Sequence, residues 1–107
     1  MGWDGADVWL MYRGRLPDCY ISESEAIKLG YRAKTGNLAD VCPGKMIGGK
    51  KYKNNEGKLP DNSYRSWLEA DFDYTSGYRN NNRIFYSTDG LIFISYDHGK
   101  TFYELIK

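Results

Sequence analysis

The hydrophobic pattern of this chain changes its period near Gly49, and this change limits the fold more than any other feature of the sequence. Before Gly49, apolar residues recur at the three- and four-residue spacing of amphipathic helices. After Gly49, apolar and polar residues alternate, as in strands that bury one face. Helices followed by strands are typical of an α+β protein with N-terminal helices packed on a C-terminal antiparallel sheet. At 107 residues, the chain is expected to form one domain, residues 1–107.

The first predicted helix is amphipathic, with Asp4 near its N-terminal end and its last residues before Gly14 to Pro17. The residues at helical spacing are Ala6, Trp9, Leu10 and Arg13.

Two further short helices are predicted. Ser22 and Glu25 form a capping box, in which Ser22 caps the helix and Glu25 reaches back. Ala26 and Leu29 then face inward, and Gly30 ends this helix. A very short third helix runs from an Asn37 cap to Cys42.

The strand pattern is clearest in residues 65–74. One side of this strand is mostly apolar: Ser66, Leu68, Ala70, Phe72 and Tyr74. The other is mostly charged: Arg65, Trp67, Glu69, Asp71 and Asp73. Such alternation predicts a half-buried strand with a polar open face. Further strands are predicted at residues 83–87, 91–96 and 101–106, joined by turns at residues 88–90 and 97–100.

Composition excludes little. The chain is 41% hydrophobic and 27% charged, as in ordinary soluble proteins, and a net charge of +1 does not by itself indicate a nucleic-acid partner. A local group of lysines is more informative: Lys45, Lys50, Lys51, Lys53 and Lys58. These lysines fit either a solvated loop and edge strand or a patch that attracts phosphate.

No apolar run approaches the roughly 20 residues that span a bilayer, so we expect no membrane partner. The first five residues lack the basic and apolar segments of a signal peptide. Cys19 and Cys42 could form one disulfide or remain two small buried thiols, and their spacing fits no metal motif.

The polar faces of the strands suggest chemistry. Glu69, Asp71 and Arg83 point to one surface, and His98, the only histidine, lies in the last turn. Cleavage of RNA needs a base, an acid and cations that stabilise the phosphate. Glu69 suits the base, His98 the acid, and Arg79 with Arg83 the cations. The ordinary alternatives are a surface histidine, a solvated glutamate, and arginines that pair across strands with Asp71 and Asp73.

The chain also resembles the barnase/binase family of microbial guanyl-preferring ribonucleases. The resemblance extends in order over essentially the whole chain. The segments that carry it are residues 16–18, 34–41, 43–45, 47–49, 54–60, 67–71, 74–79, 83–84, 97–98 and 101–102.

The resemblance implies the microbial ribonuclease fold and an enzyme without metal or cofactor. Such enzymes cleave single-stranded RNA on the 3′ side of guanine through a 2′,3′-cyclic phosphate, which is then hydrolysed. By position, Glu69 matches the general base, His98 the general acid, and Arg79 and Arg83 the phosphate-binding arginines. Asp71 matches the carboxylate that orients these arginines.

By the same resemblance, residues 52–56 belong to the substrate site. Glu56 matches the residue that accepts hydrogen bonds from guanine, Asn54 lies in the base-recognition loop, and Tyr52 holds a usually aromatic position. Asn55 stands where the family has an arginine. Arg65 and Asp89 match a structural salt bridge.

Three other positions depart from the family pattern. Glu23 replaces a lysine that helps to hold the phosphate, Lys50 replaces an acidic residue, and Gly99 replaces an aromatic one. Lys50, Lys51 or Lys53 could restore the missing positive charge. The alternative is a catalytically weakened relative that binds RNA or an inhibitor without turnover.

The resemblance further implies a monomer that is secreted or delivered as a toxin, with the signal segment absent from this chain. It also implies a barstar-like protein inhibitor. Barstar itself is expected to bind weakly, because it grips the cations that are missing here.

Overall fold

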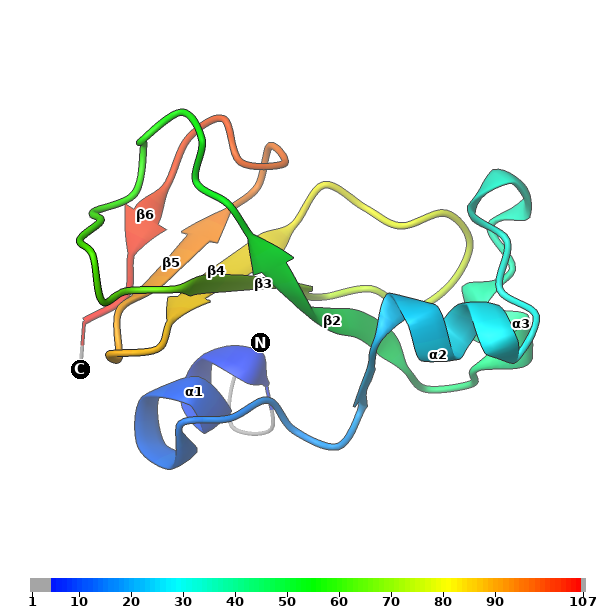
Figure 1. The fold of residues 1–107 in the computed structure, drawn as a ribbon. Helices are drawn as coiled ribbons and strands as arrows, with labels where there is room; N and C mark the ends of the chain where they lie inside the picture. Colours follow the sequence, from blue (N-terminus) through cyan, green and yellow to red (C-terminus); the bar gives the residue numbers. More distant parts are fainter. Residues whose placement is uncertain (1–4, 107) are drawn as a thin grey trace.

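The strands form one sheet in the order β1 to β6, and the three α-helices precede most of it in the chain (Figure 1). The computed structural model describes residues 5–106. The helices are α1 (Ala6–Arg13), α2 (Glu23–Lys28) and α3 (Leu38–Val41), with a 3-10 turn at Ala33–Thr35. The strands are β1 (Tyr20–Ile21), β2 (Met46–Tyr52), β3 (Trp67–Asp71), β4 (Arg83–Ser87), β5 (Ile92–Ser95) and β6 (Tyr103–Glu104). The predicted α+β fold is confirmed.

The sheet is antiparallel from β2 to β6, as predicted, but β1 pairs with the start of β2 in parallel. Two residues are too few to show a period, so β1 could not be found in the sequence. Because β1 covers only Met46 and Ile47, the rest of β2 has a single neighbouring strand. Lys50 and Lys51 are exposed on this free part, in agreement with the edge-strand interpretation.

A one-residue bulge interrupts β2 at Gly49. Gly48 pairs with Ala70, but the next pair is Lys50 with Glu69, so Gly49 has no opposite residue. Its φ of 82° lies in the left-handed region that glycine tolerates. The bulge therefore places Lys50 directly opposite Glu69.

Helix α1 packs its apolar side on one face of the sheet. Ala6 and Leu10 are buried as predicted, whereas Arg13 is exposed and stacks over Trp9 at 4.3 Å. Asp4, expected near the start of this helix, lies outside the described residues. The core beneath α1 consists of Ala6, Leu10, Ala70, Phe72, Ile84, Ile92 and Ile94.

Helix α2 follows the prediction at its start but not at its end. The Ser22 hydroxyl accepts a hydrogen bond from the Glu25 backbone N–H at 3.2 Å. Among residues 5–106 the Glu25 carboxylate makes no return bond, so only half of the capping box forms. Ala26 is buried, but the prediction for Leu29 is wrong, because this side chain is 59% exposed. The helix ends at Lys28, so helical spacing no longer sets the direction of Leu29.

Helix α3 lies where predicted, but Asn37 does not cap it through its side chain. The Asn37 Oδ1 accepts from the Arg32 backbone N–H at 2.7 Å, and its Nδ2 donates to the Gly30 carbonyl at 3.0 Å. Asn37 therefore ties together the loop between α2 and α3. A second core forms here from Ala26, Tyr31, Leu38, Cys42, Ile47 and Tyr74.

The expectation of a polar open face on the long strand is wrong for part of the sheet. Trp67 and Phe85 lie on that face, yet they are 2% and 1% exposed. The reason is a cover formed by residues 53–66, which include the buried Leu59, and by the turn after β5 with Phe102. Lys58 Nζ donates to the Lys100 carbonyl at 3.3 Å and joins the two segments, which are seen together in Figure 1. Trp67 Nε1 donates to the Pro60 carbonyl at 3.1 Å. Glu69 is left half-buried at the border of this cover.

Three strands are shorter than predicted. β3 covers residues 67–71 of the expected 65–74, β5 covers 92–95 of the expected 91–96, and β6 covers 103–104 of the expected 101–106. Cys19 and Cys42 are free thiols, so the disulfide alternative does not hold in this structure. Among residues 5–106 there is no helix long and apolar enough to cross a membrane. The same residues contain no cluster of three or more potential metal ligands from His, Cys, Asp and Glu.

Gly48 is expected to tolerate no side chain. A Cβ there would lie 2.5 Å from Cδ1 of Tyr20 and 3.0 Å from Cβ of Ala70. Tyr20 cannot easily move, because its hydroxyl donates to the Asp71 carbonyl. We therefore expect Gly48→Ala to lower the free energy of unfolding by about 1–3 kcal/mol, as overpacking does. Urea unfolding checks this, with the exposed Lys51→Ala on the same strand as control. Equal stability of the two variants would contradict it.

Candidate active site

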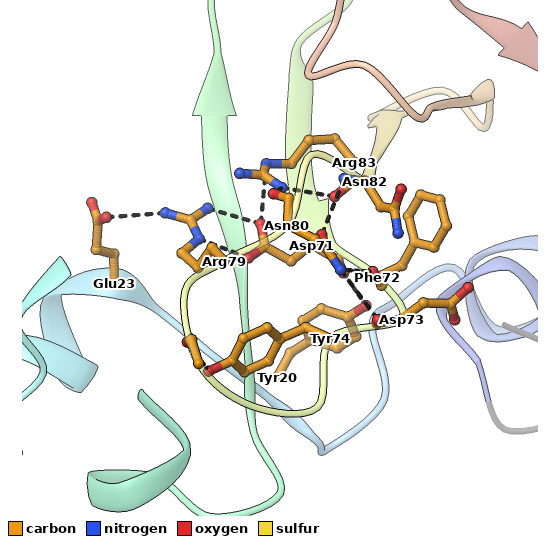
Figure 2. A network of polar contacts seen from close by, with 11 residues as sticks. Tyr20, Glu23, Asp71, Phe72, Asp73, Tyr74, Arg79, Asn80, Asn82 and Arg83 are labelled. Carbon is orange, nitrogen blue, oxygen red and sulfur yellow. Dashed lines mark hydrogen bonds and ion pairs between the residues drawn. The ribbon is translucent and has the colours of Figure 1, made fainter. Parts of the chain in front are cut away.

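Two arginines share one buried carboxylate at the end of β3 (Figure 2). Arg79 donates from Nε to Asp71 Oδ2 at 2.7 Å and from Nη2 to Asp71 Oδ1 at 2.8 Å. Arg83 Nε lies 3.1 Å from the same Oδ1. The Asp71 side chain is only 1% exposed. Both arginines thus contact Asp71. Arg83 is its partner across β3 and β4, as in the ordinary alternative, but the pair is buried and does not lie at the surface.

The two guanidinium groups experience different environments. The hydrogen bond to Asp71 raises the pKa of Arg79 and outweighs its burial. Burial lowers the pKa of Arg83, against the attraction of Asp71. Arginine is protonated far above neutral pH, so both groups remain cations despite the opposite shifts.

Residues that were not predicted from the sequence hold this cluster in place. Arg83 Nη1 donates to the carbonyls of Asn80 and Asn82 at 2.7 and 2.8 Å. The Asn80 side chain in turn donates to the carbonyls of Phe72 and Asp73 at 3.2 and 3.1 Å. These loop contacts have no sequence period, so no pattern could have revealed them.

Glu69 lies two residues before Asp71 on the same face of β3. It lines a groove of about 370 Å³ with residues 50–56. Burial raises the pKa of Tyr52, and the nearby carboxylates of Glu69 and Glu56 raise it further. The structure therefore brings Glu69 together with Tyr52, Asn54, Asn55 and Glu56, the residues expected to bind the base.

The loop of this groove is held by Asn54. Its φ of 52° is left-handed, and its buried side chain binds both backbone groups of Leu59, at 2.9 and 3.1 Å. The side-chain amide of Asn54 is therefore hydrogen-bonded within the loop. Asn55 and Glu56 are exposed, and Glu56 pairs with Lys58 at 3.2 Å.

His98 lies in a turn that Asp97 organises. The Asp97 carboxylate accepts from the Ser95 and Thr101 hydroxyls at 2.7 and 2.6 Å. These and backbone hydrogen bonds hold the pKa of Asp97 well below its usual range. The His98 backbone N–H donates to the Asn81 carbonyl at 2.9 Å, and its φ is 60°.

The pairing of β4 with β5 places this turn near the arginines. Arg83 is opposite Ser95, three residues before His98, and the imidazole is exposed. The structure thus gathers the turn of His98 and the arginine cluster at one end of the sheet.

A groove larger than the one lined by Glu69 lies elsewhere in the described structure. It has a volume of about 500 Å³ and is lined by α1, β5 and the last residues, including Leu10, Ile92 and Leu105. None of the expected site residues line it. Arg65 and Asp89 form the expected ion pair, with Nη2 2.9 Å from Oδ2.

This geometry defines a class of protein. It is an α+β protein that places a glutamate, a turn with a histidine and two arginines at one end of its sheet. A family model described as ribonuclease matches residues 11–105. A ribonuclease from Heyndrickxia coagulans is 52% identical over 99 residues, which are 92% of this chain and 91% of that protein. The chain belongs to the ribonuclease family, and the expected membership of the barnase/binase group is confirmed.

Ribonucleases from Bacillus intermedius and Bacillus pumilus are also 52% identical over 99 residues each. The matched region is 92% of this chain but 61% of those two proteins. The chain therefore spans about three fifths of their length.

Proposed function

We propose that this chain is an endoribonuclease that cleaves single-stranded RNA on the 3′ side of guanine without a metal or cofactor. The observation that carries the proposal is the position of Glu69, between the groove of residues 50–56 and the arginines held by Asp71. A nucleotide whose base enters this groove would have its phosphate near both cations.

In the first step, Glu69 takes the proton from the ribose 2′-hydroxyl, and the 2′-oxygen forms a bond to phosphorus. The bond from phosphorus to the 5′-oxygen breaks, and protonated His98 gives its proton to that oxygen. In the second step, neutral His98 takes a proton from water, and the water oxygen forms a bond to the phosphorus of the 2′,3′-cyclic phosphate. The bond from phosphorus to the 2′-oxygen breaks, Glu69 returns its proton to that oxygen, and both residues regain their starting states.

Arg79 and Arg83 stabilise the negative charge that develops on the phosphate oxygens. Because Asp71 fixes both guanidinium groups before substrate binds, little reorganisation is needed during the reaction. Asp71 itself is a positioning residue, since it is buried beneath the arginines.

Guanine presents N–H donors on its Watson–Crick edge, and the Glu56 carboxylate can accept them. Its contact with Lys58 is exposed and easily exchanged for the base. Tyr52 offers an aromatic surface for stacking, the backbone around Asn54 offers polar groups, and Asn55 replaces the expected cation of this loop.

A second candidate is a weakened relative that binds RNA or a barstar-like inhibitor without turnover. It is favoured by the Glu23 carboxylate, which lies 3.4 Å from Arg79 Nη1, on a cation that substrate would need. Secretion, a toxin role and a monomeric state are part of the main proposal, and only the family resemblance supports them.

The test is incubation with a short oligonucleotide that contains one guanosine, in EDTA. We expect one cut on the 3′ side of that guanosine, with a cyclic phosphate as the first product. Binding without cleavage would support the second candidate instead. Cleavage after several different bases would support the endoribonuclease activity but contradict the preference for guanine.

The pH dependence of kcat/KM is a separate prediction. The first step needs one group that can accept a proton and one that can donate a proton, so kcat/KM should fall on both sides of an optimum. The profile is therefore expected to be bell-shaped. A profile without an acidic limb would contradict Glu69 as the base.

A further inference from the structure

Arg79 has a limited number of hydrogen-bond donors, and most of their directions are already used. Its Nε–H and one Nη2–H grip Asp71. The only edge left for a two-point grip on phosphate is formed by Nη1 and the second hydrogen of Nη2. Glu23 Oε2 lies 3.4 Å from Nη1, on this edge, and Figure 2 shows Glu23 reaching Arg79 from the side opposite Asp71.

We infer that Glu23 occupies the phosphate-binding edge of Arg79 in the free protein, and that the substrate phosphate must displace it. Glu23 is then a determinant of phosphate affinity that acts against binding. The inference rests on the proposed function, because it takes Arg79 as a phosphate ligand.

The two carboxylates on Arg79 differ in how firmly they are held. The contact with Asp71 is 2.7 Å long, and the Asp71 side chain is 1% exposed. The contact with Glu23 is 3.4 Å long, and the Glu23 side chain is 39% exposed. A long, exposed ion pair contributes little stability. A phosphate can therefore replace Glu23 while Asp71 keeps the guanidinium in place.

A second cation is available to Glu23 once it leaves Arg79. Glu23 and Lys50 line the same groove, of about 220 Å³, together with Ser22, Ser24, Gly48 and Gly49. The bulge at Gly49 brings Lys50 to this side, opposite Glu69. Lys50 makes no ion pair with any residue from 5 to 106. We assign it as the partner of the displaced Glu23 carboxylate.

The first test measures binding rather than turnover. Guanosine 3′-monophosphate is titrated into the wild type, Glu23→Gln and Glu25→Gln, with calorimetry as the readout. Glu25→Gln removes the same charge from the same helix without a contact to Arg79. We expect Glu23→Gln to bind roughly three- to tenfold more tightly than the wild type, because one charge near the phosphate is gone. Glu25→Gln should change affinity less than about twofold.

The inference would be overturned if Glu23→Gln bound the nucleotide no more tightly than Glu25→Gln does. It would also be overturned if neither variant bound the nucleotide. Failure of the proposed function looks different, since the wild type would then leave the oligonucleotide uncut whatever the titration shows.

The second test concerns Lys50. Lys50→Gln should weaken binding of the same nucleotide in the wild type, because the displaced Glu23 loses its partner. In the Glu23→Gln background, Lys50→Gln should have little effect. An equal loss in both backgrounds would overturn this role and assign Lys50 to the phosphate itself.

Discussion

Glu69→Ala is expected to reduce kcat/KM for cleavage after guanine by about 100-fold to 10,000-fold, the usual contribution of a positioned acid or base. His98→Ala should have an effect of similar size. Both variants should stay folded, because Glu69 makes no ion pair among residues 5–106 and the His98 side chain is exposed. The measurement is initial cleavage rate of the one-guanosine oligonucleotide, with circular dichroism to confirm folding.

The double variant gives a sharper result than either single one. Because the base and the acid act in the same step, losses from the two residues should not add. The double variant is therefore expected to lose little more than the worse single variant. Glu104→Ala, on the exposed strand β6, is the matched control and should keep wild-type activity. Fully additive losses, or a Glu69→Ala variant with wild-type rate, would contradict the assignment.

The alternation in residues 65–74 predicted the strand that carries Glu69 and Asp71, and it did so for a physical reason. Successive side chains of a strand point to opposite faces, so Leu68 and Ala70 must lie on the other face of the strand from Glu69 and Asp71. The same pattern could not show what covers each face. Trp67 was assigned to the open side, but residues 53–66 and the turn after β5 bury it together with Phe85. Burial by segments that are distant in the sequence produces no periodic pattern within the strand itself.

In the candidate active site too, some features could be predicted from the sequence and others could not. Asp71, Arg79 and Arg83 could be grouped from their order and from the family resemblance. The carbonyls of Asn80 and Asn82 that hold Arg83, and the Tyr20 hydroxyl that binds the Asp71 carbonyl, could not. These contacts join β1 to the end of β3, and the loop before β4 to Arg83. They depend on tertiary structure, for which a single sequence contains no direct signal.

The role of Glu23 could be inferred only from the sequence and the structure together. The sequence identified it as a negative charge where the family has a positive one. Only the structure shows that its carboxylate contacts Arg79 and shares a groove with Lys50. The reversed signs at positions 23 and 50 therefore concern one small region, and they are expected to act together on phosphate binding.

Asp71→Ala is expected to have the largest effect on stability. The substitution leaves Arg83, whose side chain is 6% exposed, without its charged partner, and it frees Arg79 from two hydrogen bonds. Breaking a buried ion pair by removing one partner costs about 3–5 kcal/mol, because the remaining charge stays buried and uncompensated. Cleavage should also be lost at temperatures where the variant is folded, since neither arginine is then held toward the phosphate.

The measurement for Asp71→Ala is the free energy of unfolding in urea, and Glu23→Gln is its control. Glu23→Gln also removes a carboxylate from Arg79, but an exposed one, so we expect a loss below about 1 kcal/mol. The difference between the two variants compares a buried carboxylate shared by Arg79 and Arg83 with an exposed carboxylate on Arg79 alone. If Asp71→Ala were no less stable than Glu23→Gln, the shared carboxylate could not be what holds the two arginines in this fold.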